Sequence, residues 1–576
     1  MFDPQSILQD RFREALVAAF GAEIADADPM VRPSDRADFQ ANAALGLTKR
    51  LKRPPRQIAD ALLEKLAVDD ICASLEVSGP GFINVTLKDG FVSDRVSAQL
   101  TDANLGVAPA PEPETVVIDY SAPNVAKEMH VGHLRSTIIG DALARILSSL
   151  GHEVIRQNHL GDWGTPFGML IEHLLDLGEQ KASEELGVGD LSSFYREARK
   201  KFEEDPSFAE RSRNRVVHLQ AGDEPTRALW LRLVNESKRY FGKIYEQLDV
   251  TLTDDDVCGE SFYNPMLPGV AEELERRGLA KVDEGALCMF VPGFTARDGS
   301  PLPLIVRKTD GGFGYAITDL TAVRHRTGTL GATRLLYVVG SPQQQHLAMV
   351  FEAAKMAGWL TPPARAEHVA FGSVLGADGK MFKTRAGDTV KLSALVEEGV
   401  ERALAEVTSR FPELDDETRK RVAVEVGVGA IKYADLSSDR VKDYVFDFDR
   451  MLKFEGNTGG YVQYAHARCR SILRNAGQEP APGPIEITHP AERALALTLL
   501  RFGTVVHQVE ETLQPHTLCS YLFEVAGALS NFWHDCPVLK AEPEGLRASR
   551  LRMVLLTSRV IGHGLGLLGI QAPERM

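Results

Sequence analysis

The chain of 576 residues is poor in several features that define other classes of protein. It has six scattered cysteines and no CxxC pair, which argues against disulfides and against a cysteine zinc site. No segment approaches the roughly 18 consecutive apolar residues of a membrane helix. The N-terminus lacks a basic segment followed by an apolar one, so we expect no secretory signal and a cytoplasmic protein without membrane contact.

Positively charged residues are also fewer than negatively charged ones. The 65 Lys and Arg residues face 80 Asp and Glu residues, and the net charge of -15 argues against a protein that coats nucleic acid nonspecifically. The densest basic stretch is TKRLKRPPRQ, residues 48–57. A local nucleic-acid surface and a solvated helix end are equally good interpretations of it.

The length predicts several domains, and residues 1–110 fit an α+β domain. Apolar side chains four residues apart predict a helix over residues 5–20, and RPPRQIADALLEKL predicts a second helix with proline in its first turn. ICASLEV and FINVTL, separated by SGPG, predict a β-hairpin. The proline-rich stretch GVAPAPEPE then predicts an extended linker.

Residues 111–455 alternate strands with helices. TVVIDY, a helix that follows His130, and EVIRQNHL form a βαβ unit, which is typical of a doubly wound parallel sheet of Rossmann-like type. RLLYVVG, at 334–340, continues this alternation. A charged and mostly helical stretch at about 180–300 interrupts it as an insertion. Residues 456–576 have helical periodicity throughout and predict an all-α domain.

The segment MHVGHLRS, residues 129–136, places two histidines at the start of the predicted helix. No further metal ligand stands at a suitable spacing from these histidines, which argues against a metal site. Both could instead be buried in the core. A helix that follows the first strand of a doubly wound sheet is also a good site for phosphate, because free backbone N–H groups point at the ligand. Lys127 and Arg135 are expected to add positive charge there.

A second basic segment, DGKMFKTRAGDTVKL at 378–392, carries Lys380, Lys383 and Arg385 between glycines. On its own it fits a solvated loop. Together with the histidine helix it predicts mobile cations that close on a transferring phosphoryl group.

Both segments carry a family resemblance. SAPNVAKEMHVGHLRS resembles the HIGH element of class I aminoacyl-tRNA synthetases in the form found in arginyl-tRNA synthetases, and KMFKT resembles their KMSKS loop. The resemblance covers essentially the whole chain. It includes the stretches DFQANAALGLTKRL, SGPGFINV, NHLGDWGTPFGMLI, GGFGYAITDLTA, YVVGSPQQQH, NTGGYVQYAHARCRSIL and LLGIQAPERM.

The resemblance implies an arginine–tRNA ligase. Such an enzyme activates L-arginine with ATP to arginyl-adenylate and pyrophosphate, and then transfers arginine to the 3′-terminal adenosine of tRNA(Arg). It implies an N-terminal domain that binds the tRNA D-loop, a class I catalytic domain and a C-terminal anticodon-binding domain. It also implies Mg²⁺ with the ATP, no zinc and a monomer.

The resemblance assigns roles to particular residues. Those implied for ATP are His130, Gly132, His133, His346, Lys380 and Lys383. The histidine pair and the lysines, Lys127 among them, are implied in catalysis. Those implied for arginine are Asp119, Asn124, Tyr315, Asp319 and Gln343. Those implied for tRNA are Phe39, Gln40, Asn42, Tyr461, His466 and Arg468.

The implied arginine pocket agrees with the chemistry of its ligand. A guanidinium has five donors and no acceptor, so its pocket needs carboxylates and neutral oxygens. Tyr315 and Asp319 stand four residues apart, which predicts one helix face. In GDWG, at 161–164, turn shaping and a direct substrate role both remain open.

One departure from the family pattern is visible in KMFKT. Phe382 occupies the third position, where it supplies no hydroxyl, and Thr384 the fifth, so only the lysines carry over. The relative contributions of Lys127 and Lys383 stay open.

Three alternatives deserve comparison. A nucleotidylyltransferase shares HxGH but lacks a helical tRNA-binding domain. A non-catalytic relative would not need the histidines and lysines that are present. A zinc hydrolase would need further metal ligands.

Overall fold

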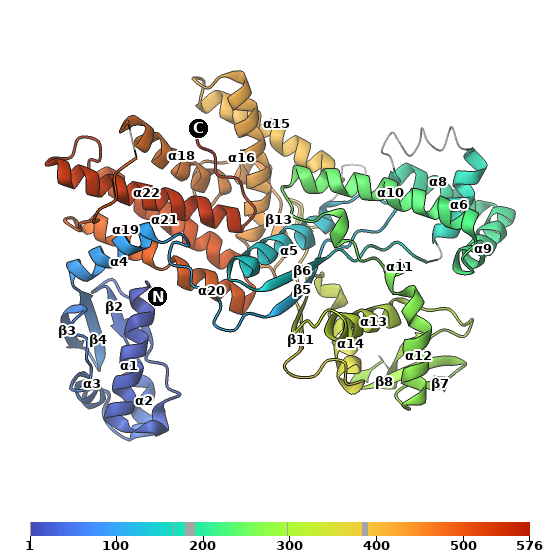
Figure 1. Cartoon of the computed structure of the whole chain (residues 1–576), viewed down its shortest axis with the longest axis horizontal. Helices are drawn as coiled ribbons and strands as arrows, with labels where there is room; N and C mark the ends of the chain where they lie inside the picture. The colour runs from blue at the N-terminus through green and yellow to red at the C-terminus, as the bar shows by residue number, and fades with distance from the viewer. Residues whose placement is uncertain (1, 165, 179–190, 297, 383–389, 478) are drawn as a thin grey trace.

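The computed structural model describes residues 2–164, 166–178, 191–296, 298–382, 390–477 and 479–576. Lys383, Thr384 and Arg385 lie outside the described residues. Figure 1 shows an elongated molecule with a sheet near its centre. The N-terminal part, in blue, lies beside the helical C-terminal part, in red, and the insertion, in green, extends from the opposite side.

The N-terminal domain combines helices with an antiparallel sheet, as the sequence predicts. Helix α1 (Pro4–Phe20) buries Leu8, Phe12 and Leu16, which share one face at a spacing of four residues. The sheet has the order β1-β2-β4-β3, and β3 and β4 form the predicted hairpin. The remaining elements are β1 (Val31–Pro33), β2 (Phe39–Ala41), α2 (Ala43–Leu51), α3 (Pro55–Leu63), β3 (Cys72–Ser78), β4 (Phe82–Leu87) and α4 (Asp89–Thr101).

The central sheet is parallel and has the order β11-β10-β5-β6. Its strands are β5 (Thr115–Asp119), β6 (Glu153–Gln157), β10 (Arg334–Tyr337) and β11 (Arg365–His368). Helix α5 (Val131–Ser149) leads from β5 to β6, and α14 (Gln344–Met356) leads from β10 to β11. The adjacent strands β5 and β10 therefore lead away in opposite directions, which creates a switch point beyond their carboxyl ends. This confirms the doubly wound architecture.

The segment between β6 and β10 begins with helices and then forms a small sheet. The helices are α6 (Pro166–Leu177), α8 (Leu191–Glu204), α9 (Pro206–Gln220), α10 (Glu224–Gln247), α11 (Glu260–Tyr263) and α12 (Leu267–Arg276). The antiparallel strands β7 (Lys281–Asp283), β8 (Ala286–Thr295) and β9 (Pro301–Arg307) follow, and then α13 (Tyr315–Gly328). This sheet was not predicted from the sequence. Met289 and Val291 bury alternate positions of β8 against a second hydrophobic core, a two-residue period within the stretch expected to be mostly helical.

The C-terminal part is mostly helical, as predicted. Strands β12 (Val374–Leu375) and β13 (Tyr444–Val445) pair beside α15 (Leu392–Arg410), α16 (Asp416–Leu436) and α17 (Phe448–Met451). The helices that follow are α18 (Gly459–Asn475), α19 (Pro490–Leu500), α20 (Phe502–Thr512), α21 (His516–Asp535) and α22 (Glu544–Leu567). Within the described part of the chain, no helix is both long and apolar enough to cross a bilayer.

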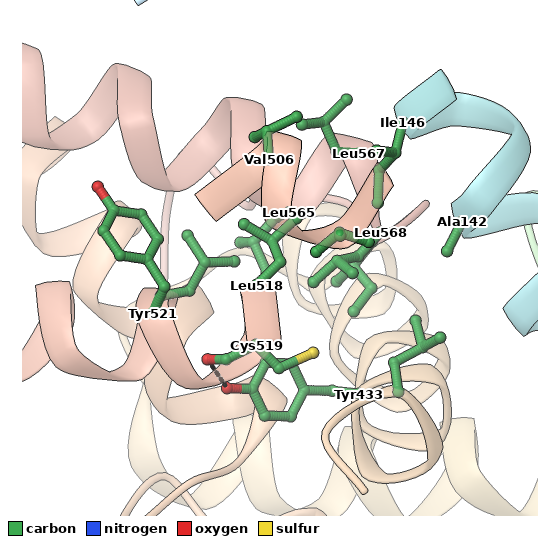
Figure 2. Close-up of a cluster of buried hydrophobic side chains, with 14 of the residues drawn as sticks. Ala142, Ile146, Tyr433, Val506, Leu518, Cys519, Tyr521, Leu565, Leu567 and Leu568 are labelled. Carbon is green, nitrogen blue, oxygen red and sulfur yellow. Dashed lines mark hydrogen bonds between the residues drawn. The ribbon is translucent and has the colours of Figure 1, made fainter. Parts of the chain in front are cut away.

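The C-terminal helices pack directly on α5. Figure 2 shows Ala142 and Ile146 of α5 among buried side chains from α16, α20 and α22. The Tyr433 hydroxyl donates to the Cys519 carbonyl at 2.9 Å within this cluster. Burial of each large apolar side chain contributes about 1.5–3 kcal/mol. The helix that starts after His130 is therefore held along its length by the C-terminal helices.

Candidate active site

The two histidines form a reciprocal cap at the start of α5. His130 Nδ1 accepts from the Gly132 backbone N–H at 3.0 Å, and His133 Nδ1 accepts from the His130 backbone N–H at 3.1 Å. An accepting Nδ1 leaves the ring proton on Nε2. Burial lowers the pKa of His133 to about 3 and, together with Lys127, lowers the pKa of His130. Both rings are therefore neutral Nε2–H donors at pH 7.

The first backbone N–H groups of α5 are already bonded, which corrects the expectation that they are free for phosphate. The Val131 N–H donates to the Val390 carbonyl at 3.1 Å, and the His133 N–H to the His130 carbonyl at 2.8 Å. The Gly132 N–H is taken by the His130 ring. The hydrogen-bond donors that remain for a ligand at this helix end are therefore the histidine side chains.

Arg135 does not face the histidine pair, contrary to the sequence expectation. Its side chain is 1% exposed and its Nε lies 3.1 Å from an Asp435 carboxylate oxygen. It falls on the face of α5 that the rest of the protein covers. Lys127, by contrast, is exposed, and its Nζ lies 4.6 Å from the centre of the Tyr195 ring.

Lys380 lies in a hairpin that follows β12. The Phe382 N–H donates to the Val374 carbonyl at 3.1 Å and closes the hairpin around the exposed Lys380. Further along, the Leu392 N–H donates to the Met129 carbonyl at 2.9 Å, directly before His130. The structure thus brings the histidine and lysine segments together, although they are some 250 residues apart in the chain.

Phe382 has a packing role at the third position of KMFKT. Its ring centre lies 5.1 Å from that of Phe446, and its side chain packs against the main hydrophobic core. Lys383, the second lysine of the motif, lies outside the described residues.

Tyr315, Asp319 and His346 form a polar group beside the sheet. Asp319 Oδ2 lies 2.6 Å from His346 Nε2, and the Tyr315 ring lies 4.8 Å from the His346 ring. Tyr315 is 67% exposed, and Gln343 is exposed directly before α14. Tyr315 and Asp319 both lie on α13, so the predicted shared face is confirmed.

Asp119 is the last residue of β5, as predicted, and Asn124 follows the strand in a different environment. Asp119 is 6% exposed and pairs with the buried Arg326, whose Nη2 lies 2.7 Å from Oδ2. Arg326 was not identified from the sequence. Asn124 is exposed opposite Gly161, where a Cβ atom would lie 2.3 Å from the Asn124 Oδ1. Only glycine leaves room for this amide.

Glu260, the first residue of α11, was also not identified from the sequence. Burial, with the neighbouring carboxylates of Asp162 and Asp319, raises its pKa to about 7. No motif marked this position, because its acidic surroundings arise only in the fold. Asp162 itself is buried and accepts from the backbone N–H and hydroxyl of Ser261 at 2.8 and 2.7 Å. This favours turn shaping as the role of GDWG.

The N-terminal residues implied for tRNA are less exposed than expected. Phe39 is 3% exposed because its strand β2 faces the domain core, so its ring is not available to stack on a base. The Gln40 side chain donates to Asn84 Oδ1 at 2.8 Å and remains half-buried at the surface. Asn42 is half-buried before α2.

On α18, the three implied tRNA residues also differ. His466 is 6% exposed and its Nδ1 lies 3.0 Å from the Pro573 carbonyl, so its ring is buried and has a partner within the protein. Tyr461 and Arg468 line a pocket between α18 and α21. The Arg468 guanidinium lies 4.8 Å from the Trp533 ring centre. The rings of Tyr461 and Trp533, together with the Arg468 cation, suit the stacking of a base.

Thiols and metal ligands are not grouped in the described part of the chain. All six cysteines are buried and free. Among the described residues, no three or more His, Cys, Asp or Glu side chains are arranged to hold a metal ion.

Comparisons with known proteins agree with this geometry. The family described as tRNA synthetases class I (R), catalytic domain, matches residues 95–448. The arginyl tRNA synthetase N terminal domain matches residues 6–87, and the DALR anticodon binding domain matches residues 462–576.

Relatives match over the full length. An arginine–tRNA ligase of Thermobifida fusca is 56% identical over 100% of both chains, and one of Edwardsiella ictaluri is 48% identical over 99% of this chain and 100% of its own. The arginyl-tRNA synthetase structure from Thermus thermophilus has a TM-score of 0.82 at 27% identity over 100% of both chains. That from Plasmodium falciparum has a TM-score of 0.82 at 28% identity over 99% of both.

The parallel sheet, the histidine cap of α5 and the adjoining lysine hairpin are those of a class I aminoacyl-tRNA synthetase. Within that class, the chain belongs to the arginyl-tRNA synthetase family, and it is an enzyme, an arginine–tRNA ligase.

Proposed function

We propose that the histidine cap and the lysine hairpin together bind ATP and stabilise the transfer of its adenylyl group to arginine. The main-chain bonds that place residues 390–392 against residues 129–131 carry this proposal, because they hold the two segments at one site. His130 and His133 donate Nε2–H bonds to phosphate oxygens, and Gly132 leaves space for the nucleotide. We also assign His346, whose Nε2 lies 2.6 Å from Asp319 Oδ2, to the binding of ATP.

The positive charge in this site comes from lysines. Lys380 faces the leaving pyrophosphate, with Lys383 and Lys127 as further cations. Neutral imidazoles stabilise a phosphate by donating hydrogen bonds, whereas ammonium groups neutralise the charge that develops on the leaving group. Fixed donors and positioned reactants are sufficient for this step, and no covalent enzyme nucleophile is required.

The arginine pocket is formed by Tyr315, Asp319 and Gln343, with Glu260 as an additional carboxylate. Its acidic groups match a guanidinium, which has donors and no acceptor. Burial first, and then the neighbouring carboxylates of Asp162 and Asp319, raise the pKa of Glu260, and a bound cation would favour its charged form. Asn124 holds the amino-acid portion. Asp119 contributes through its pair with Arg326 at the strand end.

The reaction has two steps. A carboxylate oxygen of arginine attacks the α-phosphorus of ATP, the bond from that phosphorus to the bridging oxygen breaks, and pyrophosphate leaves. A ribose hydroxyl of the 3′-terminal adenosine of tRNA(Arg) then attacks the arginyl carbonyl carbon and AMP leaves. Mg²⁺ enters with ATP, since this ion commonly binds substrate phosphates with few protein ligands.

For tRNA, we propose that Gln40 and Asn42 contact the D-loop, and that Tyr461 and Arg468 contact the anticodon arm. Each pair is at least partly exposed. We also propose that the enzyme acts as a cytoplasmic monomer, which light scattering on the purified chain would test.

The test of the overall function is exchange of pyrophosphate into ATP, measured with each of the twenty amino acids, with and without total tRNA. Among the twenty amino acids, only arginine is expected to support exchange, and only when tRNA is added. Exchange without any amino acid, or with a small cofactor precursor in place of arginine, would favour a nucleotidylyltransferase.

A further inference from the structure

Arg135 occupies a buried position between two parts of the proposed active site. Its Nε lies 3.2 and 3.1 Å from the two carboxylate oxygens of Asp435 on α16, and its Nη1 donates to the Lys442 carbonyl at 3.0 Å. The guanidinium carbon lies 5.2 Å from the centre of the Tyr444 ring and 5.8 Å from that of Phe371. The side chains of Arg135 and Asp435 are 1% and 0% exposed.

The aromatic residues around this guanidinium lie next to the paired strands β12 and β13, from which the lysine hairpin starts. Phe371 precedes β12, and Tyr444 begins β13, which pairs with β12 in parallel. Strand β12 leads directly into the hairpin that carries Lys380. The backbones approach closely here, since a Cβ atom at Gly372 would lie 2.6 Å from the Lys442 carbonyl. Figure 1 shows α5, α16 and β13 meeting beside the central sheet.

On α5, Arg135 follows His133 by two residues, so its bonds act on the first turns of the helix that presents the histidine pair. The exit of the lysine segment is fixed to the same helix end by the main-chain bonds at residues 390–392. Both ends of this segment are therefore anchored to α5. The Arg135 side chain holds the start of the segment, next to β12, and main-chain hydrogen bonds hold its end at residues 390–392.

We propose that Arg135 is a positioning residue, which sets the distance between the histidine pair and Lys380 by joining α5 to the base of the lysine hairpin. The proposal rests on the proposed function, in which both groups bind the same ATP. An apolar pair could fill this buried space at similar stability. The planar guanidinium of Arg135 instead binds the Asp435 carboxylate and the Lys442 carbonyl at the same time. It therefore fixes both the distance and the orientation between α5 and these residues.

The test uses the full chain with Arg135→Met and Asp435→Leu combined, so that no buried charge is left unpaired. The kcat for tRNA-dependent pyrophosphate exchange with arginine is expected to fall about 100-fold, as for a displacement on the order of 1 Å. The KM for arginine and the affinity for tRNA should change less than about threefold. Backbone hydrogen exchange should become faster in residues 374–382 but not in residues 137–149.

Arg145→Met combined with Asp141→Asn is the matched control, because Arg145 lies on the same helix and pairs with the buried Asp141 at 2.7 Å, away from the lysine hairpin. Its kcat should stay at the wild-type value. A folded double variant of Arg135 and Asp435 with the wild-type kcat would overturn the proposal, and so would an equal loss of tRNA affinity.

If the double variant does not fold, Arg135→Lys decides the question. A lysine keeps a charge beside Asp435 but lacks the fork that reaches Lys442 as well, so kcat should fall about tenfold. A wild-type kcat would again overturn the proposal. Failure of the proposed function gives a different result, because the wild-type chain itself would then show no exchange with arginine.

Discussion

At the residue scale, the proposed arginine pocket predicts that recognition of arginine depends most on the Asp319 carboxylate. Asp319→Ala removes a charged acceptor, and hydrogen bonds to charged groups contribute about 1.5–3 kcal/mol. The KM for arginine should rise about 10- to 100-fold, with little change in the KM for ATP, measured by pyrophosphate exchange. Glu272→Ala, an exposed acidic position on α12, is the control. Equal increases of both KM values would place Asp319 outside the arginine pocket.

Glu260 predicts a pH dependence at the same scale. Its pKa of about 7 means that the carboxyl is protonated below that pH and charged above it. A cationic substrate favours the charged form, so the KM for arginine should fall as the pH rises from 6 to 8. Glu260→Gln should raise the KM and remove this slope. A variant that keeps the wild-type slope would show that another group titrates.

At the scale of the element, α5 requires glycine at position 140. A Cβ atom there would lie 2.3 Å from Tyr120, so Gly140→Ala should destabilise the protein by about 1–3 kcal/mol despite the better helix propensity of alanine. Gly242→Ala on α10 meets no atom within 4 Å and should be neutral or stabilising. Thermal unfolding of both variants tests this contrast. A Gly140→Ala chain as stable as the wild type would indicate that Tyr120 moves aside.

At the scale of the whole molecule, Arg493 of α19 joins the N-terminal domain to the C-terminal helices. It pairs with Asp38 at 2.6 Å, contacts Asp89, and donates to the Leu87 carbonyl at 2.8 Å. Removal of one partner of such a partly buried pair costs about 3 kcal/mol. Arg493→Ala should therefore loosen the N-terminal domain and speed proteolysis of the linker at 106–114. The KM for tRNA should rise while that for ATP stays constant; unchanged proteolysis would contradict this.

The fold was largely predictable because its signals are local. Residues 8, 12 and 16 repeat at helical spacing, the β-branched run before Asp119 forms a buried strand, and prolines mark the linker after α4. Where the pattern changed its period over a short distance, as in β8 and β9, the helical expectation missed the sheet. Tertiary burial decided that region.

The sequence by itself identified His130, His133 and Lys380 as candidate active-site residues, from a predicted helix start, a glycine-flanked basic loop and the family resemblance of both segments. Only the tertiary structure decided which polar groups remain free to act. It buried Phe39, Arg135 and His466, bonded the first N–H groups of α5, and placed Glu260 near the carboxylates of Asp162 and Asp319. The physical reason is that exposure, hydrogen-bond partners and local charge depend on residues hundreds of positions away, which no local pattern contains.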